Sequence, residues 1–239
     1  MPLPKIATPT YELELPSTGK SIKYRPFLVK EEKVLVIALE SEDTKQITNA
    51  IKAVLKNCVL TKGIKVETLP TFDIEFLFLN IRGKSVGEEI EVNIVCPDDG
   101  ETNVPVFIDL DSIQVETSDD HTNQIKLDSD LMMEMKYPSL EQFIKNNFDF
   151  QEGNQMDQSF ELIATCIDKI YNEDEVWATA DCTKKEVKDF LESMNSSQFK
   201  EIEKFFESMP KLKHTIEVTN PNTKVTSEVV LEGLASFFG

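Results

Sequence analysis

The sequence is poor in the residues from which most metal sites are built. Its 239 residues include only 2 histidines, 1 tryptophan, 8 glycines and 4 cysteines, the last at positions 58, 96, 166 and 182. The cysteines form no CxxC pair and no HExxH occurs, which excludes the common zinc spacings. The acidic stretches at 109–111 and 128–130 lack the glycine that a calcium-binding EF-hand loop requires. We therefore expect no metal and no cofactor.

Signals for nucleophilic or nucleotide chemistry are also missing. There is no GxSxG, and a Ser or Cys nucleophile would need His121 or His214 as its base. The first lies in a polar stretch and the second opens an expected strand, so both are interpreted as surface residues. The segment Gly83-Lys84-Ser85 resembles a phosphate-binding loop, but position 78 is Phe where that motif needs glycine. The sequence therefore predicts that the protein is not an enzyme.

No apolar run approaches the eighteen or more residues of a membrane helix, so no membrane partner is expected. The N-terminus, Met1 to Ile6, has no apolar core of a signal peptide. We expect the protein to stay in the compartment where it is made, with its cysteines as free thiols. Cys58 and Cys166 fall in helical patterns and are expected to be buried.

Charge is strongly acidic and unevenly spread. The net charge is −18; residues 1–70 carry 11 Lys and Arg against 8 Asp and Glu, and residues 71–239 carry 14 against 35. The acidic part is a poor match for nucleic acid, which needs cationic grooves, so no nucleic-acid partner is expected. Two interpretations stay open: the charge keeps the protein soluble, or it steers the chain toward a basic protein partner.

Residue patterns indicate an α+β fold in which β-hairpins flank helical segments. Residues 1–10 carry three prolines and indicate an extended arm. Residues 11–87 alternate as a hairpin at 11–15 and 21–24, then show helical patterns at about 30–39, from 44 with Asp43 as its cap, and at about 71–81 after Pro70. A strand remains the alternative for the last of these, because it is apolar on every side.

The rest of the chain is divided into a β-rich part, 88–138, and a helical part, 139–239. Strands are expected near 90–94 and 104–108, with Pro105 marking an edge, and at 125–127 and 131–135. Residues 109–130 are interpreted as a mobile acidic loop. The helical part shows a stripe from Phe160 to Tyr171, a capping box at Thr183 and Glu186, and a helix capped by Ser196. A terminal hairpin is expected at 214–231, before an apolar tail that either folds onto the core or docks on a partner.

Four phrases, taken in order, resemble the baseplate hub protein family of T-even-like contractile-tailed bacteriophages. They are Lys23-Tyr24-Arg25-Pro26-Phe27, Asn80-Ile81-Arg82-Gly83-Lys84-Ser85-Val86-Gly87-Glu88, Cys96-Pro97-Asp98-Asp99-Gly100 and Gly233-Leu234-Ala235-Ser236-Phe237-Phe238. The resemblance covers about residues 11–238. Some members of that family carry a CPxCG-like knuckle at the third phrase. Asp99 stands in place of its second cysteine, so no zinc is expected here.

The resemblance implies a subunit or assembly factor of the phage tail baseplate hub that acts by protein–protein binding. A dissociable tail-assembly chaperone, absent from the finished virion, and an enzyme of unknown type remain as alternatives. Implied partners are hub or spike proteins and the tape-measure protein, met in the host cytoplasm during assembly or in the tail baseplate of the virion. The residues expected to bind partners lie after the first hairpin and in the tail: Tyr24, Arg25, Phe27, Leu234, Phe237 and Phe238.

Overall fold

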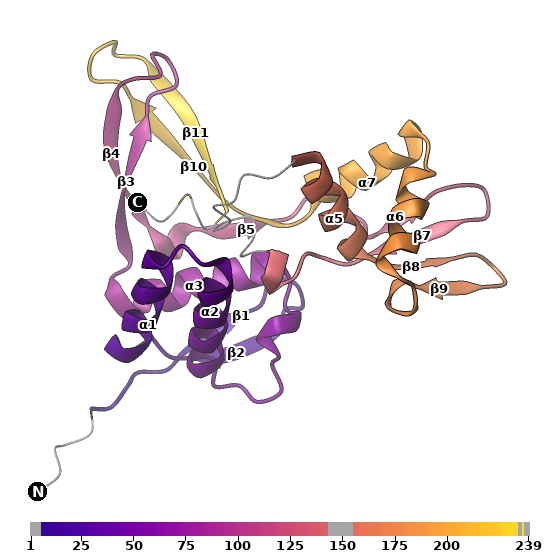
Figure 1. The fold of residues 1–239 in the computed structure, drawn as a ribbon. Coiled ribbons are helices and arrows are strands. Elements are labelled where there is room, and N and C mark those ends of the chain that lie inside the picture. The colour runs from indigo at the N-terminus through magenta and orange to yellow at the C-terminus, as the bar shows by residue number, and fades with distance from the viewer. Residues whose placement is uncertain (1–5, 143–154, 234–235, 237–239) are drawn as a thin grey trace, which may run out of the picture.

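A computed structural model defines the fold and describes residues 6–142, 155–233 and 236. Residues 1–5 of the expected arm, together with Leu234, Phe237 and Phe238, lie outside the described residues. The described chain is an α+β fold, as expected, with several small antiparallel sheets. Figure 1 shows three parts: an N-terminal unit, two hairpins that project from it side by side, and a second lobe formed by residues 122–137 and 155–209.

The N-terminal unit packs a two-stranded hairpin against helices. Its elements are β1 (Tyr11–Glu14), β2 (Ser21–Tyr24), α1 (Val29–Glu40), α2 (Thr44–Cys58), the 3-10 turn η1 (Val66–Thr68) and α3 (Thr71–Val86). The hairpin and all three helices are confirmed. The side chain of Asp43 caps α2 by accepting hydrogen bonds from the backbone N–H groups of Lys45 and Gln46, at 2.8 and 3.1 Å.

Helix α3 is the centre of this unit, and most of its residues are buried. It begins directly after Pro70, whose ring is compatible with a helix start, and ends at Gly87, whose φ of 130° an L side chain rarely adopts. The strand alternative for this segment is therefore wrong. A carboxylate, Asp73, is fully buried in the first turn of α3, where it accepts hydrogen bonds from the N–H and hydroxyl of Ser17 in the β1–β2 turn. Burial raises the pKa of Asp73 above its usual value, against the effect of these hydrogen bonds.

Two hairpins project side by side and are joined at their tips (Figure 1). One pairs β3 (Glu89–Val95) with β4 (Asn103–Asp109), and the other pairs β10 (Lys211–Thr219) with β11 (Thr226–Glu232). The amide nitrogen of Asn220 donates to Asp98 at 3.0 Å and to Asp99 at 2.8 Å, so two turns more than a hundred residues apart are held together. Strand β4 pairs with β3 alone, which places Pro105 on an edge strand as expected.

In the described part of the chain, the second lobe places a four-stranded antiparallel sheet beside helices α5, α6 and α7. Its elements are β6 (Gln124–Lys126), β7 (Met132–Met135), α5 (Gln155–Cys166), β8 (Ile167–Tyr171), β9 (Val176–Ala178), the 3-10 turn η3 (Thr179–Asp181), α6 (Lys184–Glu192) and α7 (Ser196–Ser208). The strands follow the order β6-β7-β8-β9. The capping box of Thr183 and Glu186 at the start of α6 is confirmed, as is the helical hairpin of α6 and α7.

Buried apolar residues form two separate clusters. One joins the N-terminal unit to the paired hairpins, with Leu77, Ile94 and Leu231 among its members. The other holds the second lobe together through Met133, Ile167 and Phe205, among others. The sequence suggested that one part of the chain ends before residue 88 and another before residue 139. The first cluster contains residues from both sides of position 88, and the second contains residues from both sides of position 139.

Three local expectations are corrected. Residues 109–130 are not one loop, because they contain η2 (Leu110–Ser112), the buried Ile113, and β5 (Gln114–Glu116), which pairs with β10. The helix expected to run through Tyr171 ends at Cys166, and the chain continues as β8, since its two sheet neighbours supply backbone partners. Asn195, not Ser196, caps α7, and its side chain accepts hydrogen bonds from the backbone of the two residues after Ser196.

Candidate functional site

Tyr24, the first of the residues expected to bind partners, is the last residue of β2. Tyr24 points inward on β2, as Ile22 does, and is only 2% exposed. Its ring lies 5.7 Å from the ring of Tyr11, in a tilted arrangement. In this conformation its side chain has no face to offer a partner. The pattern that predicted the strand also explains this, because every second residue of a half-buried strand points into the core. Of the residues expected to bind partners, this one belongs to the core.

Arg25 forms a largely buried ion pair at the start of α1. Its guanidinium donates to Glu31 at 2.9 Å, and Glu31, only 4% exposed, also accepts the backbone N–H of Leu28 at 2.8 Å. Burial opposes ionisation of Glu31, but the hydrogen bonds from Arg25 and Leu28 outweigh it and hold the pKa of Glu31 below its usual value. The hydrogen bond to Glu31 raises the pKa of Arg25. The pair fixes the chain direction from β2 into α1.

Phe27 lies at the edge between core and surface. Its backbone N–H donates to the hydroxyl of Ser85 at 2.9 Å, which ties the start of α1 to the end of α3. The ring is half-buried against the core and lines a groove of about 310 Å³ between α1, α2 and α3. Phe27 is therefore the one residue after the first hairpin whose ring borders an open apolar groove.

Helix α1 exposes an apolar outer face. The spacing of its residues predicted the helix but did not show which side of it would be exposed. Its side chains Val29, Val34, Val36 and Ile37 are exposed, at 79%, 47%, 47% and 53%. Only Glu31, Leu35 and Ala38 of this helix are buried. Val36 also lines the groove beside Phe27, as does the exposed Val86 at the end of α3. A helix that is apolar on several sides is normally covered on several sides. In the described chain, this one is covered on the inner side alone.

The apolar tail cannot be placed in the same way, because Leu234, Phe237 and Phe238 lie outside the described residues. The chain leading to it is firmly held. Leu231 is buried in the core of the N-terminal unit and hairpins, and the N–H of Gly233 donates to the carbonyl of Leu212 at 3.0 Å. Both alternatives from the sequence therefore remain open: the tail folds onto the core, or it docks on a partner.

The described part of the chain shows no metal-binding cluster. Three or more metal-ligating side chains nowhere cluster among its residues. His121 is partly buried, and it is not the freely exposed surface residue that was expected. Its ring nitrogens lie 2.9 Å from the hydroxyls of Ser208 and Tyr137, and its ring stacks on Tyr137. Burial lowers the pKa of His121, so the neutral ring is favoured in this polar link within the second lobe.

In the turn at residues 96–100, Cys96 is buried and Asp99 organises the turn. The carboxylate of Asp99 accepts hydrogen bonds from the hydroxyl of Thr102 and from the backbone N–H groups of Glu101 and Thr102, which lowers its pKa. Gly100 completes the turn at a φ of 68°. The position that a second cysteine occupies in a knuckle therefore serves here as a turn-forming carboxylate. Among the residues that the structure describes, no helix is both long and apolar enough to cross a bilayer.

Comparison with known proteins agrees with the resemblance noted in the sequence. The family model described as T4 bacteriophage base plate protein matches residues 8–239. Comparisons with the curated proteins and with the solved structures give no significant match. The match confirms the resemblance to phage baseplate proteins and extends over both buried clusters and both projecting hairpins. Because it covers nearly the whole sequence, the chain belongs to the T4 bacteriophage base plate protein family.

Proposed function

We propose that this protein is a hub subunit or hub assembly factor of the tail baseplate, and that it works by protein–protein docking rather than by catalysis. It would act in the host cytoplasm during assembly and remain in the tail baseplate. The apolar outer face of α1 is the observation that carries this proposal. Family membership supplies the class of partner, which is another baseplate protein. Hub and spike proteins, and the tape-measure protein, are the candidates.

The geometry of α1 suits an apolar docking contact. Val29 and Val36 lie two helical turns apart on one side of the helix, and the groove bordered by Phe27 lies next to Val36. Lys30 and Lys33 are exposed between them, which gives the apolar stripe a charged border. Interfaces combine a desolvated apolar centre with a polar rim in this way. A partner that covers this stripe removes from water the apolar side chains that the fold itself leaves exposed.

The test is the double substitution Val29→Asp and Val36→Asp in the phage chain. Both side chains already face solvent, so the fold should tolerate the change, whereas a carboxylate at each position would be buried without a partner in the complex. We expect the variant to fold and to fail in binding other baseplate proteins during infection, measured by sedimentation of assembly intermediates. Val176→Asp is the matched control, since Val176 is an exposed valine of β9 in the second lobe.

Normal assembly by the Val29/Val36 variant would refute the role of α1. Mass spectrometry of purified virions separates the subunit from a dissociable tail-assembly chaperone, which predicts absence from finished particles. If the protein were instead an enzyme of unknown type, a variant that abolishes its function would leave the complexes with other baseplate proteins intact.

A further inference from the structure

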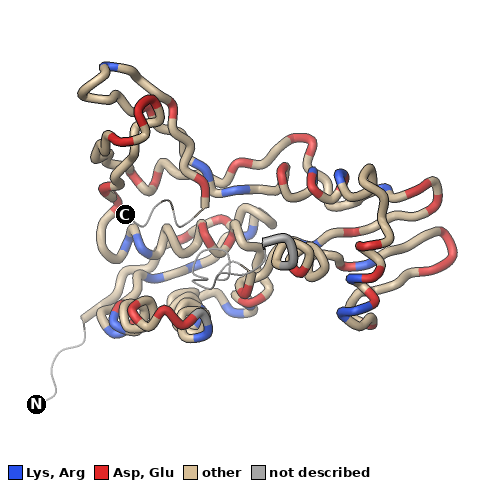
Figure 2. The backbone as a smooth tube through the Cα atoms, turned by 45° about the horizontal axis from the view of Figure 1, so that its top comes forward, with Lys and Arg blue, Asp and Glu red and all other residues tan. Residues whose placement is uncertain are grey.

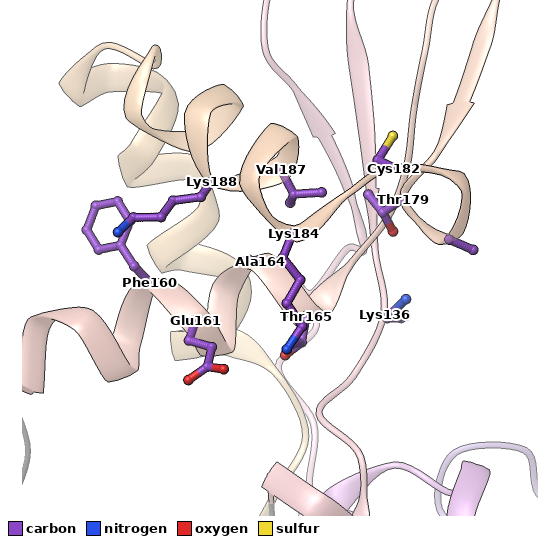
Figure 3. Close-up of a pocket in the computed structure, with 11 residues that line it drawn as sticks. Lys136, Phe160, Glu161, Ala164, Thr165, Thr179, Cys182, Lys184, Val187 and Lys188 are labelled. Atoms are coloured by element: carbon purple, nitrogen blue, oxygen red, sulfur yellow. The ribbon is translucent and has the colours of Figure 1, made fainter.

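The second lobe carries a groove that none of the preceding arguments uses. It lies between α5, α6 and η3, has a volume of about 560 Å³, and falls within the range of ~300–1,000 Å³ of ligand-sized sites. Its apolar surface comes from Phe160 and Ala164 of α5 and from Val187 of α6. Figure 3 shows these side chains together, with the ring of Phe160 at one end and Cys182 toward the other.

Three lysines rim this groove. Lys184 and Lys188 come from successive turns of α6, and Lys136 comes from the segment after β7. Figure 3 shows Lys188 extending toward the ring of Phe160 and Lys184 reaching toward Thr165. The lining residues include a single carboxylate, Glu161 of α5.

The charge of the groove is opposite to that of its lobe. Residues 122–137 and 155–209 contain eight lysines, no arginine, and sixteen Asp and Glu, a net charge of −8. Figure 2 shows the acidic and basic positions interspersed over this lobe. The lining of the groove, with three lysines against Glu161, has a net charge of +2. Local cationic groups in an acidic surface favour an anionic group held at that point, while the surrounding field disfavours an extended polyanion such as nucleic acid.

The lysines keep their charge available for a ligand. Lys136 lies 3.8 Å from Asp168, and Lys188 lies 3.7 Å from Glu192; both pairs are half-exposed and at the long end of ion-pair distances. Exposed pairs of this kind contribute little and exchange readily. Within the described residues, Lys184 has no ion-pair partner.

We infer that this groove binds a short acidic, amphipathic segment of a partner baseplate protein. An apolar side chain of that segment would fill the space between Phe160, Ala164 and Val187, and its Asp or Glu residues would meet Lys184 and Lys188. The apolar lining of the groove holds the apolar side chain of the segment, and the lysines orient the segment and select an acidic partner. The identity of the partner as a baseplate protein rests on the proposed function, but binding in the groove does not depend on α1.

Overlapping 15-residue peptides that cover the phage's tail proteins, this chain included, provide the probe. The purified full-length protein is titrated with each labelled peptide, and binding is followed by fluorescence anisotropy. Peptides from another tail protein that combine Asp or Glu with an apolar anchor should bind, and binding should weaken as salt is raised. The double variant Lys184→Glu and Lys188→Glu should weaken it by about tenfold or more, because two attractive contacts become repulsive.

The control is Lys185→Glu with Lys200→Glu, which makes the same charge change at exposed lysines outside the groove. It should bind within about twofold of the unmodified protein, since these positions contribute only to the general field. Cys182 adds an independent measurement, because it lines the groove as an exposed thiol while the other cysteines are buried. Attachment of a bulky maleimide to Cys182 should block the peptide.

Four results would overturn the inference. The first three are the absence of binding by any acidic peptide, equal loss in the control and groove variants, and binding that survives modification of Cys182. The fourth is preference for a segment of this chain itself, which would point to a second copy and not to a partner. Because the Val29/Val36 variant leaves the groove intact, failure of the proposed docking function and failure of this inference give different results.

Discussion

Breaking the ion pair between Arg25 and Glu31 on one side should destabilise the N-terminal unit by about 2–3 kcal/mol. Replacing Arg25 by Met removes the guanidinium 2.9 Å from a carboxylate that is only 4% exposed. Breaking a buried pair on one side costs ~3–5 kcal/mol, because the remaining charge is left desolvated. A cost at or just below the lower end of this range, about 2–3 kcal/mol, is expected here. The Arg25 side chain keeps 15% exposure, and Lys30 lies 3.5 Å from the same carboxylate oxygen, so the remaining charge is partly compensated.

Urea unfolding followed by far-UV circular dichroism measures this cost, and the sole tryptophan supplies an internal control. Trp177 lies on β9 of the second lobe, whose buried cluster is separate from that around α1. The variant should therefore shift the circular-dichroism transition more than the Trp177 fluorescence transition. The double variant Arg25→Met and Glu31→Gln should recover much of the loss, since the glutamine amide keeps an acceptor for the Leu28 N–H without a buried charge.

The cost should also depend on pH. The folded-state pKa of Glu31 is lowered, so its ionised form contributes stability above the unfolded pKa, and that contribution is lost as pH falls through the lowered value. The difference between the unmodified protein and Arg25→Met should therefore be largest near neutrality and shrink below about pH 4. A cost under ~1 kcal/mol at neutral pH, or a double variant as unstable as the single one, would refute the reasoning.

Three further predictions concern other parts of the chain. Asp73→Asn should remove one pH dependence of the free energy of unfolding. Because the pKa of Asp73 is raised in the folded state, its stabilising contribution is present at low pH and is lost as pH rises from about 4. The free energy of unfolding of the unmodified protein, relative to that of the Asn variant, should therefore fall over that range. Asn220→Ala should free the hairpin tips by removing the hydrogen bonds to Asp98 and its neighbour; faster amide exchange in both turns, with a cost of about 1–3 kcal/mol, is expected, and unchanged exchange would contradict the link. Of the thiols, Cys182 should react first with a thiol reagent, whereas Cys166, whose pKa burial raises to about 12, should react only on unfolding, as mass spectrometry of the labelled protein can show.

Much of the local structure was readable from short stretches of sequence. Asp43, Thr183 and Glu186 cap helices by contacts within three residues, so their roles are set by local spacing alone. The two projecting hairpins follow from alternating residues around a turn, and α3 from a dense apolar segment after Pro70. The ordered phrases also identified the family. In each case the decisive neighbours lie close together in the chain.

Errors arose where a distant segment decided the structure. Ile167 and Ile170 fit a helical stripe as well as a strand, and only pairing with β7 and β9 selects the strand. Within the stretch interpreted as a loop, Gln114–Glu116 becomes a strand because β10, about a hundred residues later, supplies its partner. For Tyr24 the sequence left the extent of burial open, and its position on β2 turns the side chain into the core.

By itself, the sequence determined the α+β class, most of the helices and hairpins, the strong negative charge and the family, because each depends on composition or on neighbours in the chain. Only the tertiary structure decided which surfaces are free. The outer face of α1 is exposed because the rest of the N-terminal unit covers its inner side alone. The lysine-rimmed groove exists because Lys136 comes beside Lys184 and Lys188, which are separated from it by almost fifty residues. Surfaces of this kind are properties of packing, and packing joins residues that no local pattern relates.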